Sequence, residues 1–155
     1  MKRFAPKILA LSLVFSVITA AVGHDGAEGI VRERMDLMQS VNRSMKSIRD
    51  MVRGKTQTDM AKIAAAARSI SNQAEFLPFM FPTDQNRKFS RSSPKIWKDP
   101  EGFRASAGNL VKAAKSVEAA AQENNEARIK AAFRSLTKAC GSCHKQYRLS
   151  KRHNN

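Results

Sequence analysis

Two cysteines and a histidine lie close together near the C-terminal end of this 155-residue chain, in the order Cys140-Gly141-Ser142-Cys143-His144. Thiols three positions apart lie on one side of a helical turn, from which both can form thioethers to the vinyl groups of one porphyrin. The imidazole of the next residue then points at the iron from the same face. This spacing predicts covalent attachment of one haem c through Cys140 and Cys143, with His144 as the proximal iron ligand.

Three other kinds of site can use a cysteine pair. A disulfide between Cys140 and Cys143 would close a very short loop on a helix, where disulfide geometry is poor. A structural zinc ion needs about four ligands, whereas His24 and His153 lie near the two ends of the mature chain. A thioredoxin-like redox pair needs alternating strands and helices around it, and the sequence around the two cysteines shows no such alternation. Haem attachment is therefore favoured, and a haem-free helical adaptor is expected only if attachment fails.

Residues 1–23 are predicted to be a signal peptide. Three basic residues within the first seven precede an apolar run at 8–22, and this run is short for a bilayer span. A retained membrane anchor is the alternative. Export to the bacterial periplasm fits the cysteines, because thioether formation protects both thiols from oxidation there. We expect residues 24–155 to form a single periplasmic haem domain with no membrane span after signal removal.

The charge of the chain is strongly positive, with 28 Lys plus Arg against 13 Asp plus Glu. Three of the basic residues and no acidic ones lie in the predicted signal peptide. The mature chain therefore has 25 basic and 13 acidic residues, a net charge of +12 before any haem propionates. Such a field favours acidic redox partner proteins. Nucleic acid, the usual partner of a basic domain, is not expected for an exported protein.

Two amphipathic helices are predicted in the first half of the mature chain. Apolar residues recur every three or four positions over about 27–53, and Gly54 is expected to end this helix. A second stripe covers about 58–77, and Pro78 is expected to stop it. The connection over 79–98 contains several aromatic residues that we expect to pack against the core: Phe79, Phe81, Phe89 and Trp97.

Two more helices are predicted after this connection. Asp99, followed by a proline and an acidic residue, is expected to cap the third. Asn125 is expected to cap the fourth, which runs through the cysteine motif. No strand pattern and no internal repeat appear. The sequence thus predicts an all-α fold, an antiparallel up-down-up-down four-helix bundle with covalently attached haem on the last helix.

Three stretches carry a resemblance to the class II cytochromes c, the cytochrome c′ family, over the whole mature chain. Residues 140–148 read as Cys-x-x-Cys-His-x-x-Tyr/Phe-Arg, placed near the C-terminus rather than near the N-terminus. Residues 92–97 are similar to the loop before the third helix, where Pro-x-Ile-Trp recurs. Arg34, Met38 and Gly54 match the spacing of the first helix, in which an Arg lies four positions before the residue over the distal face of the iron.

The resemblance implies that Met38 is the distal iron ligand, as in the low-spin Met/His branch of the family. In the five-coordinate branch an apolar residue stands at this position. Methionine at helical spacing also serves as core filler, and Met35 and Met45 lie on the same stripe. Met35 is the second choice for the ligand.

Two arginines receive supporting roles from the resemblance. Arg34, one turn before Met38, is implied to bind a haem propionate through its guanidinium group. Arg148, one turn after His144 and facing the same way, is implied to lie near the proximal imidazole. A solvated surface charge is the alternative for each arginine. Tyr147 is expected to serve packing.

These features predict a periplasmic mono-haem cytochrome that carries one electron at a time, with six-coordinate His/Met iron. We expect no enzymatic activity, because neither an open metal position nor an acid–base pair is evident. The alternative function is binding of nitric oxide or carbon monoxide at five-coordinate iron. The resemblance also makes a homodimer through the first two helices conceivable, although the basic residues of the first helix oppose self-association.

Overall fold

The computed structural model describes residues 27–82 and 89–150, and the predicted signal peptide lies outside the described residues. It consists of four long helices and two short helical segments in the connection between the second and third: α1 (Gly29–Val52), α2 (Met60–Phe76), η1 (Leu77–Met80), α3 (Lys95–Lys98), α4 (Pro100–Gln122) and α5 (Glu126–Tyr147). In this described part of the chain no strand is present, only one isolated bridge between Ser92 and Arg148. The all-α prediction is confirmed.

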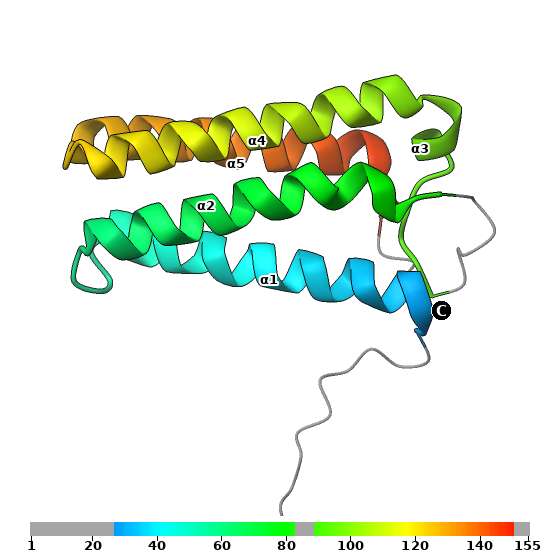
Figure 1. The fold of residues 1–155 in the computed structure, drawn as a ribbon, viewed down its shortest axis with the longest axis horizontal. Helices are drawn as coiled ribbons and strands as arrows, with labels where there is room; N and C mark the ends of the chain where they lie inside the picture. Colours follow the sequence, from blue (N-terminus) through cyan, green and yellow to red (C-terminus); the bar gives the residue numbers. More distant parts are fainter. Residues whose placement is uncertain (1–26, 83–88, 151–155) are drawn as a thin grey trace, which may run out of the picture.

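The four long helices form an antiparallel bundle, as predicted, in which each helix packs against two others (Figure 1). The contacts of α4 with α2 and with α5 are the most extensive, and α1 packs against α2 over a smaller area. Contact between α1 and α5 is the smallest of the four. The side of the bundle between α1 and α5 is therefore the least closed. Among the described residues, no helix has the length and apolar character needed to cross a membrane.

The helix ends follow the local chemistry of the sequence. Asp59, Asp99 and Asn125 cap α2, α4 and α5, each accepting a hydrogen bond from the backbone N–H three residues later, at 3.0, 3.1 and 3.0 Å. Gly54 follows α1 with φ 68°, a conformation that favours glycine, and its N–H donates to the Met51 carbonyl at 3.0 Å. The predicted caps Asp99 and Asn125 and the predicted stop at Gly54 are confirmed.

The end of the second helix differs from the prediction. Pro78 does not stop the chain from coiling, because α2 ends at Phe76 and continues directly as the 3-10 turn η1. Proline is tolerated in the first turn of a helix, where its missing N–H has no intrahelical partner. Pro78 occupies such a position in η1. The α-helix therefore ends just before Pro78, as predicted, and the difference is only that the chain continues as a tighter turn.

The aromatic residues of the connection pack only in part, so the prediction was wrong for two of them. Phe81 and Trp97 are half-buried, and the Trp97 indole N–H donates to the Phe81 carbonyl at 3.2 Å. Phe79 and Phe89 keep 79% and 54% of their surface exposed. Leu77 is a buried member of the smaller cluster and Phe81, directly after η1, packs against it, whereas Phe79 between them stays exposed.

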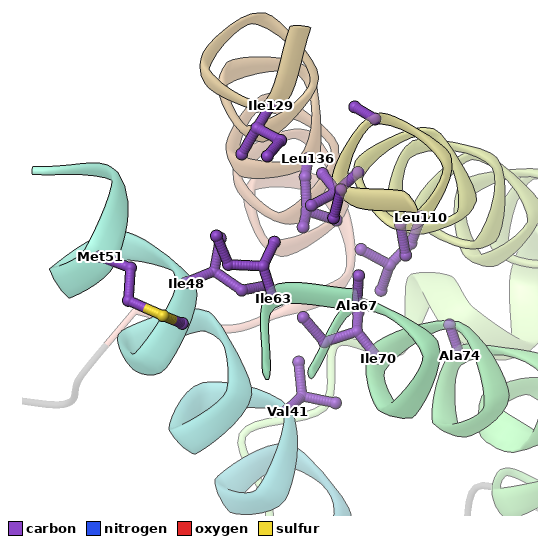
Figure 2. Close-up of a cluster of buried hydrophobic side chains, with 14 residues drawn as sticks. Val41, Ile48, Met51, Ile63, Ala67, Ile70, Ala74, Leu110, Ile129 and Leu136 are labelled. Atoms are coloured by element: carbon purple, nitrogen blue, oxygen red, sulfur yellow. The ribbon is translucent and has the colours of Figure 1, made fainter. Parts of the chain in front are cut away.

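The larger of two hydrophobic clusters fills the body of the bundle (Figure 2). Ile48, Ile63, Ile70, Ile129 and Leu136 are its largest side chains, and each is at most 2% exposed. Between them lie buried alanines of α2 and α4. Small side chains let helix axes approach closely, which fits the extensive contact between these two helices.

A smaller cluster closes the end of the bundle where α5 finishes. Leu77, Ile96, Phe103 and Tyr147 are its buried members. Edge-to-face ring contacts run from Trp97 to Phe81, on to Phe103 and then to Tyr147, with centroid distances of 6.0, 5.1 and 5.2 Å. Such contacts stabilise beyond the area they bury. They join η1, α3, α4 and α5 into one rigid end.

Candidate haem site

The two cysteines lie on α5 where the two hydrophobic clusters meet. Both are half-buried, and Cys140 packs against the larger cluster while Cys143 packs against the smaller one. They are not joined in a disulfide. Burial raises the pKa of Cys140, and burial together with the neighbouring Cys140 raises the pKa of Cys143 to about 11. Both side chains are therefore neutral thiols, one on each side of the junction between the clusters.

His144 follows on the same helix, and its side chain reaches the protein surface. Partial burial of the imidazole ring lowers the pKa of His144, and the positive charges of Arg148 and Arg91 lower it further. A lowered pKa favours the neutral imidazole, whose free nitrogen can bind a metal ion. The surroundings of His144 therefore keep it in the form that an iron ligand requires.

Arg148 was predicted to lie on the last helix, one turn after His144, but it lies just beyond the end of that helix. It ends α5 with extended backbone angles, φ −123° and ψ 130°. The backbone around it pairs with the connection instead, since the Ser93 N–H donates to the Tyr147 carbonyl at 3.0 Å and the Leu149 N–H donates to the Arg91 carbonyl at 2.8 Å. Arg148 is close enough to lower the pKa of His144, but it approaches from an extended segment.

Arg91 is a second guanidinium near His144 that the sequence interpretation missed. Its Nη2 donates to the Leu149 carbonyl at 2.7 Å, which fixes the side chain across the end of α5. Burial lowers the pKa of Arg148, and the charge of Arg91 lowers it further. Arg91 lies in the connection between α2 and α4, where no helical or strand periodicity indicates which way a side chain points. Only the pairing of residues 91–93 with 147–149 reveals its position.

Met38 lies on α1, is half-buried, and packs against both hydrophobic clusters. It thus shares the smaller cluster with Cys143. Met45 packs only against the larger cluster, and Met35 packs against neither. Leu37, which the sequence interpretation left out, contacts the same two clusters as Met38. The structure therefore brings Met38 and Leu37 toward the cysteine motif, and not Met35.

Arg34 is buried, with only 5% of its surface exposed, so a solvated surface charge is excluded. Its guanidinium carbon lies 4.5 Å from the centre of the Phe81 ring, and its Nη1 donates to the Met80 carbonyl at 3.2 Å. Burial lowers the pKa of Arg34. Taking a cation out of water is costly. A guanidinium placed one turn before Met38 is suited to bind an anionic group there.

Comparison with known sequences bears directly on this arrangement. The sequence profile of cytochrome c′ matches residues 29–148, which includes all four long helices. The chain belongs to the cytochrome c′ family. A cytochrome c-556 of Agrobacterium fabrum is 30% identical over 145 residues, covering 94% of this chain and 97% of that protein. Members of the family carry covalently attached c-type haem, and so does this cytochrome.

Solved structures of the family share the fold. A cytochrome c′ variant from Rhodopseudomonas palustris superimposes with a TM-score of 0.72 at 25% identity, covering 80% of this chain and all of that chain. A nitric oxide complex of a cytochrome c′ variant from Alcaligenes xylosoxidans gives 0.71 at 22% identity, with 79% and 94% covered. The four-helix bundle is therefore the family fold.

The side chains of this cytochrome fit one haem. Two neutral thiols stand next to an imidazole on α5, and α1 carries the thioether of Met38 and the buried guanidinium of Arg34. These are the donor types that a c-type haem uses. They lie on α1 and α5, whose mutual contact is the smallest in the bundle. A separate cavity of about 130 Å³, lined by Gly54, Ile63 and Ile129 among others, contains none of these residues.

A hydrogen-bonded joint holds the last turn of α5 against the start of α4 in this cytochrome. Tyr147 is 4% exposed, and its hydroxyl donates to Asp99 Oδ2 at 2.9 Å. The other oxygen of Asp99 accepts the Gly102 N–H at 3.1 Å. Burial raises the pKa of Tyr147, and the bond to Asp99 raises it further, so the phenol stays protonated. The cap of α4 thereby positions the turn that follows His144.

Gly102 makes room for this joint, which leads to a stability prediction. A Cβ at Gly102 would lie 2.7 Å from the Tyr147 hydroxyl and from one oxygen of Asp99, and closer still to the other. Alanine favours a helix over glycine by about 1 kcal/mol, but losing the cap costs about 1 kcal/mol and a buried bond to a carboxylate about 1.5–3 kcal/mol. We expect Gly102→Ala to lower the free energy of unfolding by about 2 kcal/mol, measured by urea denaturation.

Gly108 on the same helix provides the matched control. A Cβ there meets no atom within 4 Å. Gly108→Ala should therefore raise the stability by up to about 1 kcal/mol through helix propensity alone. Equal effects of the two substitutions would contradict the role assigned to the Asp99–Tyr147 joint.

Proposed function

We propose that this cytochrome is a mono-haem electron carrier with His144 and Met38 as the two axial iron ligands. The observation that carries the proposal is the position of Met38, which packs against the same cluster as Cys143, next to the proposed proximal ligand. Methionine sulfur is a common axial ligand of electron-carrying haem proteins. Met35, the second choice, packs against neither cluster.

Each side chain has a defined task in this proposal. Cys140 and Cys143 hold the group at two points along one turn of α5, and His144 offers a neutral nitrogen. Met38 contributes a thioether, which favours the reduced state and raises the potential. Bound in this way, the haem supplies a reversible one-electron couple. With ligands from both sides, the protein needs no proton transfer and no substrate pocket, so we expect no enzymatic activity.

Two arginines would tune this site. The guanidinium of Arg34, whose several N–H groups can serve more than one acceptor, would bind a propionate through a charge-assisted hydrogen bond. Arg148, together with Arg91, would place positive charge beside the proximal imidazole. Positive charge near the iron disfavours the oxidised state, because oxidation adds one more positive charge to the same region.

The compartment and the partners follow from the same proposal. We propose that residues 1–23 direct export to the bacterial periplasm and are removed, and that residues 24–155 form the mature haem domain. The net charge favours acidic redox partner proteins. A homodimer stays a prediction from the family resemblance.

The alternative function is binding of nitric oxide at five-coordinate iron. It is favoured by the structural likeness to the nitric oxide complex from Alcaligenes xylosoxidans. Leu37 also supports it, because this apolar side chain packs against the same clusters as Met38. If Leu37 rather than Met38 covered the distal side, a small neutral ligand could enter.

Optical spectra of the purified holoprotein, oxidised and reduced, before and after carbon monoxide, distinguish the two functions. Narrow low-spin bands, a far-red sulfur-to-iron charge-transfer band and slow or absent carbon monoxide binding are expected for an electron carrier. Broad high-spin bands with rapid carbon monoxide binding would reject Met38 ligation and support gas binding.

A further inference from the structure

The outward face of α5 carries a row of basic side chains. Lys130, Arg134, Lys138 and Lys145 are all exposed, and their spacings of four, four and seven residues place them on one face of the helix. Ile129, Leu136 and Tyr147 are buried on the opposite face. The row runs from residue 130 to residue 145, which corresponds to about 22 Å along the helix axis. We call these four residues the basic row.

The charge of the basic row is not neutralised by the described part of the protein. Among the residues that the structure describes, no ion pair involves any of its four side chains, and Glu126, in the first turn, is the only acidic residue of α5. α5 has five Lys or Arg residues against one Glu, and of the five only Arg128, before the row, is in an ion pair within the described part of the protein, with Glu123. Pairs on the other long helices include Lys46–Asp50, Arg68–Glu118 and Lys115–Glu75. The positive charge of the chain is therefore least compensated on the helix that carries the haem-attachment motif.

The basic row passes directly over the attachment motif. Gly141 and Ser142, the two residues between the cysteines, are exposed and lie between Lys138 and Lys145. A Cβ at Gly141 would meet nothing within 4 Å, so packing does not require glycine there. Glycine inside a helix costs about 0.5–1 kcal/mol relative to alanine. Its effect here is to leave the helix backbone between the two cysteines uncovered, where another protein can approach closely.

More positive charge surrounds the end of the basic row. Lys95 lies beside it, since its Nζ donates to Gln146 Oε1 at 3.2 Å. Arg91 and Arg148 are held next to each other by the pairing of their backbone segments. The cationic surface therefore continues from α5 around the C-terminal turn that contains His144.

We propose that the basic row, together with the exposed Gly141 between Lys138 and Lys145, is the docking surface for an acidic redox protein. The inference rests on the proposed electron-carrier function and names where the partner binds. An anionic membrane surface is the less favoured occupant, because Phe76 and Phe79, the most exposed large apolar side chains of the described residues, lie on α2 and η1, and α5 is followed only by the less exposed Leu149. Neither segment packs against α5.

The test compares two double variants with the same change in net charge. Arg134→Glu/Lys138→Glu reverses the centre of the basic row, and Arg104→Glu/Lys112→Glu reverses two exposed residues of α4. Two readouts are measured on the holoproteins at about 10 mM and about 500 mM salt: NMR-detected binding of a decaglutamate peptide, and the rate of oxidation by ferricyanide. In this oxidation, one electron leaves ferrous iron, and ferricyanide becomes ferrocyanide.

At low salt the α5 variant should lose peptide binding and react roughly tenfold more slowly than the α4 variant, and high salt should remove the difference. Equal effects in both variants would overturn the proposal, because only the net charge would then matter. Binding to vesicles that contain anionic lipid without any binding of the peptide would overturn it in favour of a membrane. Thermal unfolding of each variant verifies that the bundle is intact.

Failure of the electron-carrier proposal would give a different experimental result from failure of the docking surface. If the wild-type spectrum is high-spin and carbon monoxide binds rapidly, the electron-carrier proposal fails. Peptide binding that still maps to α5 and depends on Arg134 and Lys138 would nonetheless support the docking surface. Loss of that dependence in a protein with a low-spin spectrum would overturn the docking surface alone.

Discussion

Replacing Met38 by leucine is expected to convert the haem iron of this cytochrome from six-coordinate to five-coordinate. Leucine has a similar volume and no donor atom, so the packing of α1 is retained while the sulfur ligand is lost. We expect the far-red charge-transfer band to disappear, carbon monoxide to bind at least tenfold faster, and the reduction potential to fall by about 0.1 V or more. Absorption spectroscopy, stopped-flow mixing and a redox titration measure the three effects.

Met35→Leu is the matched control for this experiment. It makes the same chemical change one turn earlier on α1, at a side chain that packs against neither hydrophobic cluster. The control should keep the wild-type spectrum and the slow carbon monoxide binding. If Met35→Leu opened the iron instead, the ligand would be Met35. If neither substitution changed the spectrum, neither Met38 nor Met35 would be a ligand, and the proposed His144/Met38 ligation would be rejected.

Removing both cysteine thiols is the second change with a large expected effect. Cys140→Ala/Cys143→Ala should yield a chain with no covalently attached haem, because no other cysteine is available in the sequence to form a thioether. The side-chain loss itself should cost only about 1–2 kcal/mol, since both cysteines are half-buried and alanine is accepted in helices. Haem staining of a denaturing gel and intact mass spectrometry provide the measurement.

The single variants are the internal controls. Cys140→Ala and Cys143→Ala each retain one thiol, so each should keep a haem attached through one thioether, in lower yield than the wild type. A double variant that still carried the mass of haem after denaturation would contradict attachment through these residues. Loss of haem on denaturation from the wild type itself would show that the group is bound without covalent bonds.

The caps and the motif spacing could be predicted because they are local. Asp99 and Asn125 each bond a backbone N–H three residues away, and Gly54 supplies a left-handed turn. Such features need only the neighbouring residues and the helix geometry. The order of the four helices also followed from the apolar periodicity and from the short turns within each helix pair.

Positions that depend on residues distant in the sequence could not be predicted in this way. The hydroxyl of Tyr147 bonds Asp99 across 48 positions, and Arg91 reaches the carbonyl of Leu149 across 58. Phe79 and Phe81 look equivalent in the sequence, but Phe79, within the 3-10 turn, is exposed, whereas Phe81, directly after the turn, packs against the smaller cluster. Hydrophobicity alone does not distinguish them, because the direction of a side chain depends on the turn that carries it.

The sequence by itself determined the all-helical bundle, the helix caps and the covalent haem motif, since periodicity, capping and thiol spacing act within a few residues. The tertiary structure decided that Arg34 is buried, that Met38 and Leu37 approach the motif while Met35 does not, and that the uncompensated positive charge lies on the outward face of α5. These properties depend on which helix faces which, and packing between distant segments sets that choice.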